Sequence, residues 1–458
     1  MSLTETERPS NIATDSGFKA NDIKEGYQMN EKILNEEYKI WKKTSPLLYD
    51  LLYTYSCDSP PLSIQWLNDF KTSINDNNEQ YIEANLLMGT HSIKSQNFLK
   101  LVSICVPRTL SNDYKQSELQ SNIPNSLLKS RQLRVVREWN HPGEVNKLKI
   151  NKFNNFAASH TNSGDILLFD INDETCKTHK STLKFHSKEG FGLEWNPHLN
   201  KKNLLLSSSE DCKIALWDIN FEKLSNELKP SRIISSHENI VNDISWNKSM
   251  ETVFASVSDD SSYQIHDLRL STGPIVHITN AHHDPDSDNQ FNFPINTVDF
   301  NTDIPSLFAT GGSDNSIQIW DLRNPSIPLR RFSGHQAPVI GLKFHENYLL
   351  SSSIDNRVLI WDLNRLEEGE PDKRKSDYLD PCLSYMHGGH TGKINDADWH
   401  PVLENLMATC AEDGLLEIWR PAHLGDEYIE EEQEEEEAEK NEETKDGETK
   451  TDDVEMKD

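Results

Sequence analysis

The sequence predicts an all-β fold: a seven-bladed WD-repeat β-propeller with an N-terminal α-helix and a disordered acidic C-terminal tail. The first observation behind this prediction is a recurring unit, whose clearest copy is Arg331–Leu363. It opens with Gly334-His335, continues through three short β-rich runs bounded by turn residues, and closes with Trp361-Asp362. A Gly-His opening and a Trp-Asp ending about forty residues apart are typical of a propeller blade, which buries its faces only against neighbouring blades.

The second observation is that the blade ending recurs. Full or weaker copies stand, at intervals of roughly 41 to 58 residues, at Phe169-Asp170, Trp217-Asp218, His266-Asp267, Trp320-Asp321, Trp361-Asp362 and Trp419-Arg420. The first strands of these six repeats are expected near residues 144–150, 190–195, 240–246, 295–300, 339–344 and 393–399. A degenerate repeat without Trp-Asp precedes them, with strands expected at 62–67, 84–91 and 97–105, which makes seven blades.

The third observation concerns the two ends of the repeat array. The segment Leu47–Ser56 is apolar and aromatic enough for a strand but has no blade of its own, and the last repeat ends at Trp419 without an outer strand. We therefore expect Leu51–Tyr55 to complete the final blade and close the ring. Closure removes the exposed edge strands that would otherwise pair with other chains.

The remaining segments are assigned in order along the chain. Residues 1–22 are polar and expected to be disordered. A helix is predicted over 23–46, because Ile33, Leu34, Tyr38 and Trp41 fall on one stripe at near-helical spacing. We expect it to end at Thr44-Ser45-Pro46, since the residue before a proline avoids the helical region. The propeller follows over 47–425 and the acidic tail over 426–458.

Composition restricts the class of partner. The net charge is −29, and the tail contributes eighteen acidic residues against four lysines. This balance disfavours direct, sequence-specific binding to nucleic acid and favours a basic protein, although the tail could also serve solubility alone. No run of eighteen apolar residues is present, so we expect no transmembrane helix and no membrane partner. The six scattered cysteines, without a CxxC pair, are typical of a reduced intracellular protein.

Several motifs resemble catalytic or metal sites but fit them poorly. Histidine–aspartate pairs such as His335 with Asp355 recur blade after blade, which indicates buried hydrogen-bond networks that staple each blade. The run 284–288 resembles a calcium loop but lacks its glycine and its final glutamate, and 387–394 lacks the first glycine and the hydroxyl of a phosphate loop. We therefore expect no enzymatic activity, no cofactor and no metal.

Several stretches resemble the histone-binding WD-repeat family, which includes retinoblastoma-associated histone chaperones, the small subunit of chromatin assembly factor one and the partner subunit of the type B histone acetyltransferase. They are Asn35–Asp50, Leu87–His91, Asn140–Asn146, Lys188–Pro197, Trp320–Asn324 and His387–Lys393. The resemblance covers about residues 30 to 424, and its N-terminal helix motif is the most specific part.

The resemblance implies a groove on the side of the propeller that receives the first helix of histone four. One wall would be the N-terminal helix and its following strand, and the other the insertion before the last blade, Glu367–Leu383. Apolar anchors would set the register while carboxylates meet arginines on the incoming helix. The residues that match this groove are Trp41, Leu47, Leu48, Asp50, Asp377, Leu379, Asp380 and Pro381.

The resemblance also implies a second site, on one flat end of the ring, for a basic extended tail such as that of histone three. The matching positions are Glu144, Asn146, Glu189, Phe191, Asn242, Asn296 and Glu412. This chain departs from the family pattern at Asn242, where a carboxylate is expected, and at Pro338 and Ile340, where a carboxylate and an aromatic residue are expected.

The sequence favours a non-catalytic histone chaperone that holds the histone three–four pair for nucleosome assembly, as the small subunit of chromatin assembly factor one. The alternatives are the partner subunit of the type B histone acetyltransferase and a shared subunit of deacetylase or corepressor complexes. A more distant alternative is a generic WD-repeat scaffold or ubiquitin-ligase substrate receptor, which would not need the helix and strand at 30–50. The expected partners are histones four and three and larger subunits of a chromatin complex, and the expected location is the nucleus, with the cytoplasm as an alternative.

Overall fold

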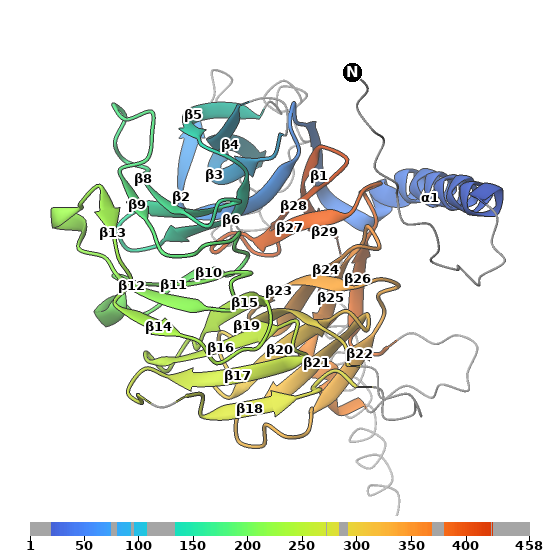
Figure 1. Cartoon of the computed structure of the whole chain (residues 1–458). Helices are drawn as coiled ribbons and strands as arrows, with labels where there is room; N and C mark the ends of the chain where they lie inside the picture. Colours follow the sequence, from blue (N-terminus) through green and yellow to red (C-terminus); the bar gives the residue numbers. More distant parts are fainter. Residues whose placement is uncertain are drawn as a thin grey trace, which may run out of the picture.

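A computed structural model describes residues 20–74, 80–92, 96–107, 133–271, 273–283, 292–368, 380–422 and 424. In these residues seven antiparallel sheets follow one another around a ring, with one long helix, α1, at its side (Figure 1). This is the predicted seven-bladed propeller. No helix within the described ranges is long and apolar enough to cross a membrane.

The first four blades follow the order of the chain, except for one short strand, β13. Blade one holds β2 (Pro61–Ile74), β3 (Gln80–Thr90), β4 (Asn97–Pro107) and β5 (Arg134–His141). Blade two holds β6 (Val145–Asn151), β7 (Phe156–Thr161), β8 (Ile166–Asp170) and β9 (Ser181–Leu183), with β13 (Glu227–Leu228) added in parallel at its edge. Blade three holds β10 (Leu193–Trp195), β11 (Leu204–Ser208), β12 (Ile214–Asp218) and β14 (Arg232–Ile234). Blade four holds β15 (Val241–Trp246), β16 (Val253–Ser258), β17 (Ser262–Asp267) and β18 (Val276–Thr279).

Blade five holds β19 (Ile295–Phe300), β20 (Leu307–Gly312), β21 (Ser316–Asp321) and β22 (Arg330–Ser333). Blade six holds β23 (Val339–His345), β24 (Tyr348–Ser353), β25 (Val358–Asp362) and β26 (Leu383–His387). Blade seven holds β27 (Ile394–Trp399), β28 (Met407–Ala411), β29 (Leu415–Pro421) and β1 (Tyr49–Ser56). Short 3-10 helices lie at η4 (Leu199–Lys201), η5 (Phe221–Lys223) and η6 (Leu363–Glu368).

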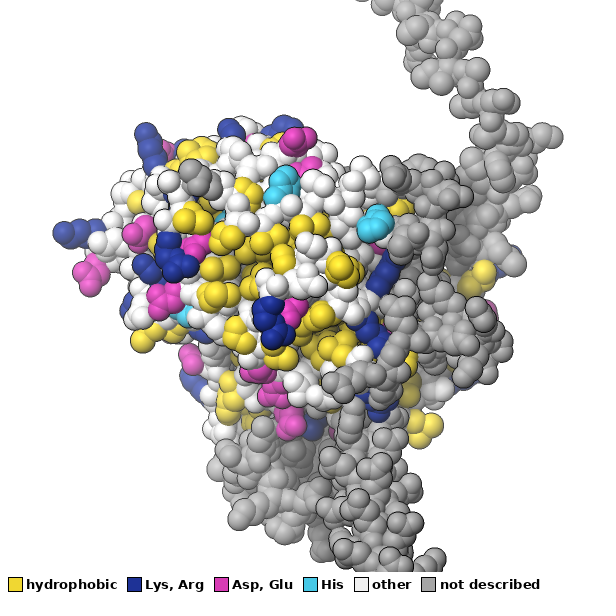
Figure 2. Space-filling model, turned by 90° about the horizontal axis from the view of Figure 1, so that it is seen from below, with side chains coloured by type: hydrophobic (Ala, Val, Ile, Leu, Met, Phe, Trp, Pro, Cys, Tyr) yellow, Lys and Arg dark blue, Asp and Glu magenta, His cyan; other side chains and the backbone are white. Residues whose placement is uncertain are grey.

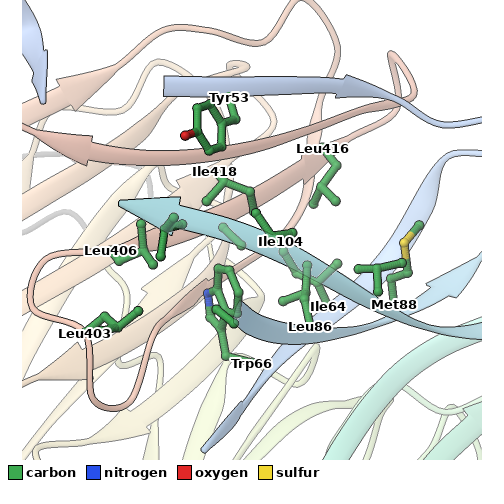
Figure 3. Packing of buried hydrophobic residues seen from close by; sticks show 14 of the residues in the cluster. Tyr53, Ile64, Trp66, Leu86, Met88, Ile104, Leu403, Leu406, Leu416 and Ile418 are labelled. Carbon is green, nitrogen blue, oxygen red and sulfur yellow. The ribbon is translucent and has the colours of Figure 1, made fainter. Parts of the chain in front are cut away.

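The ring is closed by strands from opposite ends of the chain, as expected. Strand β1 pairs antiparallel with β29, from Tyr49 opposite Pro421 to Ser56 opposite Leu415. A continuous apolar cluster then joins blade seven to blade one, with Tyr53, Leu416 and Ile418 on one side and Trp66 and Leu86 among the residues on the other (Figure 3). The buried apolar side chains of this cluster hold the first and last blades together.

The histidine–aspartate pairs form buried networks, which confirms their structural interpretation. In blade six, Ser351 Oγ lies 2.7 Å from His335 Nε2 and accepts a 2.9 Å bond from Trp361 Nε1, while His335 Nδ1 lies 2.9 Å from Asp355. The same arrangement recurs in blades three, five and seven, around Ser207, Thr310 and Thr409. Each network satisfies polar groups that would be costly to bury unpaired.

Charged side chains of the first strands meet near the ring axis and link neighbouring blades. Asp243 accepts from the backbone nitrogen of Val298 at 3.2 Å, and Asp299 accepts from that of Phe344 at 2.9 Å. The ammonium of Lys248 lies 3.3 Å from Asp299, which balances part of this charge. These contacts bind the first strands of neighbouring blades to one another.

The expected end of the helix before Pro46 is wrong. Helix α1 runs over Ala20–Leu48 and contains Pro46. A proline removes the donor for the carbonyl four residues earlier, and here the hydroxyl of Ser45 donates to that carbonyl, Lys42 O, at 3.2 Å. Beyond the proline, Leu48 O accepts from the Tyr385 hydroxyl at 2.9 Å and from Ala422 N at 3.0 Å. Bonds to blades six and seven thus hold the last helical turn that local preference disfavours.

Candidate functional site

An apolar groove lies between α1 and blade six. It encloses about 310 Å³. The helix contributes Leu34, Glu37, Tyr38, Ile40, Trp41, Thr44 and Leu48. The other side is formed by the turn before β25 and by the end of β26, with Asp355, Asn356, Arg357, Met386, Gly388 and His390. A mostly apolar groove with one helical wall suits an amphipathic helix as its ligand.

Helix α1 carries two apolar stripes, and only one of them packs on the propeller. Leu34, Tyr38 and Trp41 are half-buried, and Trp41 packs on the core of blades six and seven. A second stripe at Ile33, Ile40 and Leu47 is 48%, 62% and 76% exposed. At 3.6 residues per turn, the two stripes lie about 120° apart around the helix axis. The groove lies on the side between them, so α1 offers apolar surface to a further partner.

A chain of hydrogen bonds fixes this helical wall to the interior of blade seven. Trp41 Nε1 donates to the Tyr49 hydroxyl at 2.8 Å, and that hydroxyl lies 2.8 Å from His387 Nδ1. Because an indole nitrogen can only donate, the Tyr49 hydroxyl donates to His387. The remaining proton of His387 is then on Nε2, which lies 3.0 Å from a carboxylate oxygen of Glu417. Thr54 also donates to Glu417, at 2.9 Å. We call this chain, Trp41–Tyr49–His387–Glu417, the α1 relay.

The protonation states of the α1 relay agree with its geometry. Burial lowers the pKa of His387 and therefore favours the neutral imidazole. Burial opposes ionisation of Glu417, but the hydrogen bond from His387 outweighs it and lowers the pKa of that carboxyl. Burial also raises the pKa of Tyr49. The relay is thus a neutral donor chain ending on a buried, ionised carboxylate.

The end of the α1 relay is also the one group of described side chains close enough together to hold a metal ion. The potential ligand atoms of His387, His390 and Glu417 lie within 4.8 Å of one another. However, both ring nitrogens of His387 belong to the relay, and Nε2 of His390 lies 2.9 Å from Thr409 Oγ1. The facing atoms His387 Nε2, His390 Nδ1 and Glu417 Oε2 make no hydrogen bond of good geometry. Each side chain is nevertheless held through its other polar atom, and we assign no metal site.

The structure brings together some of the residues predicted for the groove. Trp41 and Leu48 line it, and Leu47 lies on the exposed stripe beside it. Asp50 lies at the start of β1, with its carboxylate 3.8 Å from Arg420 Nε. The predicted Asp377 and Leu379 lie outside the described residues, as does most of the insertion that was expected to form the second wall.

The predicted role of Asp380 needs correction. Its side chain is buried, and its carboxylate lies 3.0 Å from Arg330 Nη2 and accepts from Cys382 N at 3.0 Å. Arg330 is itself buried and requires a counter-ion, so the charge of Asp380 is neutralised inside the propeller rather than offered to the groove. The adjacent Pro381 is half-buried. These two residues anchor the end of the insertion.

The structure adds Met386 and Ile40, which sequence reasoning missed. Met386 is 50% exposed and lines the groove opposite the helix. The signal was available: in the outer strand Leu383–His387 alternate residues face outward, and a methionine there is a large apolar side chain at a solvent-facing position. Glu37 adds a carboxylate at the groove, 3.3 Å from Arg357.

On the flat end of the ring, three of the predicted residues share one hollow of about 330 Å³. Its lining includes Asn146, Phe191 and Glu412, together with Leu62, Ile340, Ile354, Lys393, Ile394 and Asn395. Glu412 lies 3.6 Å from Lys393, and Asn146 donates to Glu189 at 3.3 Å. Glu144 lies 3.4 Å from His91 Nδ1. The three predicted carboxylates, Glu144, Glu189 and Glu412, thus each have a polar partner within the chain, and the hollow itself is lined largely by apolar side chains.

Asn242 and Asn296 have a structural role at this end. Asn242 Nδ2 donates to Ile295 O at 2.9 Å, and Asn296 Nδ2 donates to Val339 O at 2.8 Å. Asn395, at the same position of blade seven, donates to Pro61 O at 2.8 Å. Each amide joins one blade to the next. These asparagines therefore stabilise the ring whether or not a histone tail binds at this end.

Comparison with known proteins gives consistent results. Residues 36–108 match the family described as histone-binding protein RBBP4 or the C subunit of the CAF1 complex, and residues 277–321, 326–362 and 381–420 match the WD domain, G-beta repeat. The chain is 32% identical over 402 residues to histone acetyltransferase type B subunit 2 of Candida glabrata, covering 86% of this chain and 90% of the relative. It is also 32% identical over 392 residues to the protein of that name in Eremothecium gossypii, covering 84% and 85%.

The matched residues 36–108 contain the groove-lining part of α1 from Glu37 onward and the ring-closing β1. The alignments to the two relatives extend over most of the propeller as well. The chain therefore belongs to the family of histone-binding WD-repeat proteins.

Proposed function

We propose that the chain is the non-catalytic, histone-binding partner subunit of a type B histone acetyltransferase. Both relatives carry that name, and their alignments cover 84% to 86% of the chain. This support outweighs the preference of the sequence analysis for the small subunit of chromatin assembly factor one. The nuclear location that we expect rests on this role.

The groove beside α1 is the proposed site for the first helix of histone four. The observation that carries this proposal is the exposed stripe at Ile33, Ile40 and Leu47, which continues the apolar groove across the helix. Apolar side chains of an incoming helix would set its register on this surface. Its arginines would meet carboxylates. Glu37 and Asp355 line the described part of the groove, and Asp377 remains a prediction.

The test is binding of a peptide of the histone four helix to the purified chain and to a variant with Leu47→Asp and Leu48→Asp. We expect the double substitution to cost about 3 kcal/mol or more of binding, as for central anchors of an interface. The side chain of Leu47 is 76% exposed, so its replacement leaves the fold intact. Ile327→Asp is the matched control, because Ile327 is 64% exposed on another blade. Equal affinity of the folded double variant and the wild type would refute the groove assignment.

A second experiment separates the acetyltransferase from the assembly factor. The chain is mixed either with a type B catalytic subunit or with the large subunits of chromatin assembly factor one. We expect a stable complex with the former and a higher kcat/KM for acetylation of histone four. A complex with the assembly-factor subunits alone would restore the function that the sequence favoured.

The tail site for histone three stays a separate proposal, tested by the effect of Glu412→Lys on binding of that tail.

A further inference from the structure

Three junctions between neighbouring blades share one construction. An arginine on the outer strand of blade one, three or five reaches a backbone carbonyl of the next blade. Arg137 donates to Ile171 O, Arg232 Nη1 to Leu268 O at 2.9 Å, and Arg330 Nη1 to Leu366 O at 3.0 Å. The three junctions can therefore be compared position by position.

Two of these junctions are filled by a pair of aromatic rings. The first ring stands two residues after the arginine and the second on the third strand of the next blade. The pairs are Trp139 with Phe169, at 6.3 Å between centroids, and Phe332 with Trp361, stacked at 4.7 Å. All four side chains are fully buried. In both junctions the rings fill the space between the blades.

The third junction, between blades three and four, has smaller side chains at both positions. Ile234 stands two residues after Arg232, and His266 stands on β17 where other blades have tryptophan. His266 keeps the polar role of that tryptophan, with its Nε2 3.0 Å from Ser256 Oγ. What is lost is volume: an imidazole and a butyl group replace two larger rings.

The lost volume reappears as a cavity of about 190 Å³ at this junction. Its lining is mixed. The apolar side chains are Ile233, Ile234 and Leu268, and the polar or charged ones are Arg232, Ser235, Ser236, His266, Asp267 and Ser271. A cavity of about 150 Å³ in another protein is large enough to bind benzene. The space therefore suits a phenol or an indole ring.

One lining residue, Ser236, has a buried hydroxyl without a hydrogen-bond partner among the described residues. A buried polar group without a partner costs about 1–3 kcal/mol. Tyrosine and tryptophan each combine an apolar ring with one polar group, which could meet this hydroxyl once the ring is seated and the Ser236 side chain has turned toward it.

The surface near the cavity carries exposed apolar residues beside the charged Arg232, Asp267 and Arg269. Ile233 and Leu270 are 49% and 45% exposed, and Ile275 is 51% exposed at the start of the next outer strand. The face seen from below, where β17 and β18 lie in Figure 1, shows hydrophobic side chains gathered among scattered charges (Figure 2). A deep anchor position surrounded by exposed apolar residues is how the energetic centre of a protein interface is built.

We propose that this cavity, between blades three and four, is an anchor site for one tyrosine or tryptophan side chain carried by a segment of a partner protein. The site belongs to a different junction from the groove, which lies at blades six and seven. It does not depend on the proposed histone site, and both could be occupied together.

The first test uses indole and p-cresol as probes of the full-length chain, observed through the methyl resonances of Ile233 and Ile234. We expect saturable shifts at these two methyl groups in the wild type. His266→Trp refills the cavity with the ring that other blades carry, and it should abolish the shifts. If that variant does not fold, Ile234→Phe fills the same space from the other side. Absence of saturable binding, or equal binding by the filled variant, would mean a merely water-filled cavity and would overturn the proposal.

The second test asks for a peptide rather than a free ring. A displayed peptide library is selected on the wild type and counter-selected on His266→Trp. We expect enriched sequences to share a single tyrosine or tryptophan and to lose at least tenfold in affinity on Ser236→Ala or Ile275→Asp. Ile304→Asp, on an exposed residue of another blade, is the control and should leave affinity unchanged. Selection of peptides without an aromatic residue would contradict the anchor.

Discussion

A single hydroxyl, that of Tyr49, connects the N-terminal helix to the interior of the ring. It accepts from Trp41 and donates to His387, which in turn faces the buried Glu417. Because each group in this chain is buried or half-buried, removing one of them leaves its neighbours without a partner. The wall of the groove therefore depends on a buried residue, Tyr49, that does not line the groove.

We expect Tyr49→Phe to lower the free energy of unfolding by about 1–3 kcal/mol, since it strands the Trp41 and His387 nitrogens. It should also weaken binding of the histone four helix, because α1 is held less firmly. Urea denaturation and peptide titration measure the two effects. In a double-mutant cycle with Trp41→Phe, the coupling should be about 0.5–3 kcal/mol. Additive effects of the two substitutions would show that the chain of bonds carries no shared energy.

At the scale of elements, α1 and β1 are adjacent in sequence but have different structural roles. Helix α1 ends at Leu48, and β1 begins at Tyr49 with no linker between them. The helix provides a wall of the groove, whereas the strand completes blade seven. Two truncations separate these roles.

Removal of residues 1–47 should abolish binding of the histone four helix and lower the melting temperature only modestly, because Trp41 is lost from the α1 relay but the ring remains closed. Removal of residues 1–56 should lower the melting temperature sharply and promote aggregation, since β29 becomes an exposed edge strand. Differential scanning calorimetry and light scattering distinguish the two variants. A similar melting temperature for both truncations would contradict the structural role of β1.

The sequence predicts the elements well where the signal is local or repeated. The unpaired apolar run at 47–56 and the missing outer strand after Trp419 together predict the ring closure, and the repeated His–Asp pairs predict the buried networks. Prediction fails where distant residues decide the outcome. Pro46 stays helical because Ser45 bonds Lys42 O and because blades six and seven bond Leu48 O.

The groove shows the same limit. Trp41 and Leu48 are predictable from their place in a helix motif, but Asp380 is not, because its partner Arg330 lies on another blade, fifty residues away. The apolar character of the groove's second wall comes from Met386, which only the strand alternation of β26 could have indicated.

At the scale of the whole molecule, buried histidines make stability depend on pH. Burial lowers the pKa of His141 and His400 to about 4, and that of His160 and His266 to about 3. These residues stay neutral in the folded chain, whereas the unfolded chain binds protons below about pH 6.5. Stability is therefore complete above pH 6.5 and falls as the pH decreases toward 4.

Within that window, each such histidine can lower the free energy of unfolding by up to about 1.4 kcal/mol for every unit by which the pH falls. The carboxylates of the blade networks act lower: burial opposes ionisation of Asp314 and Asp413, but bonds to His282 and His390 outweigh it and lower both pKa values to about 2. The stability that these carboxylates contribute is intact above about pH 3.8 and lost below it.

We expect the melting temperature to fall between pH 6.5 and 4 at constant ionic strength, with a shallower slope in His266→Trp. A constant melting temperature across this range would contradict the prediction.

The ring closure also has a consequence for biosynthesis. A ribosome makes β1 among the first strands and its partner β29 as the last, and at about 5–20 residues per second the two are separated by tens of seconds. During that interval the apolar residues of β1 lack their neighbours, and α1 lacks the bond from Ala422 N that holds its final turn. The wall of the groove is therefore fixed only after β29 and Ala422 have been made. A chain that ends before β29 would lack the proposed histone groove, and its unpaired β1 would be open to pairing with other chains.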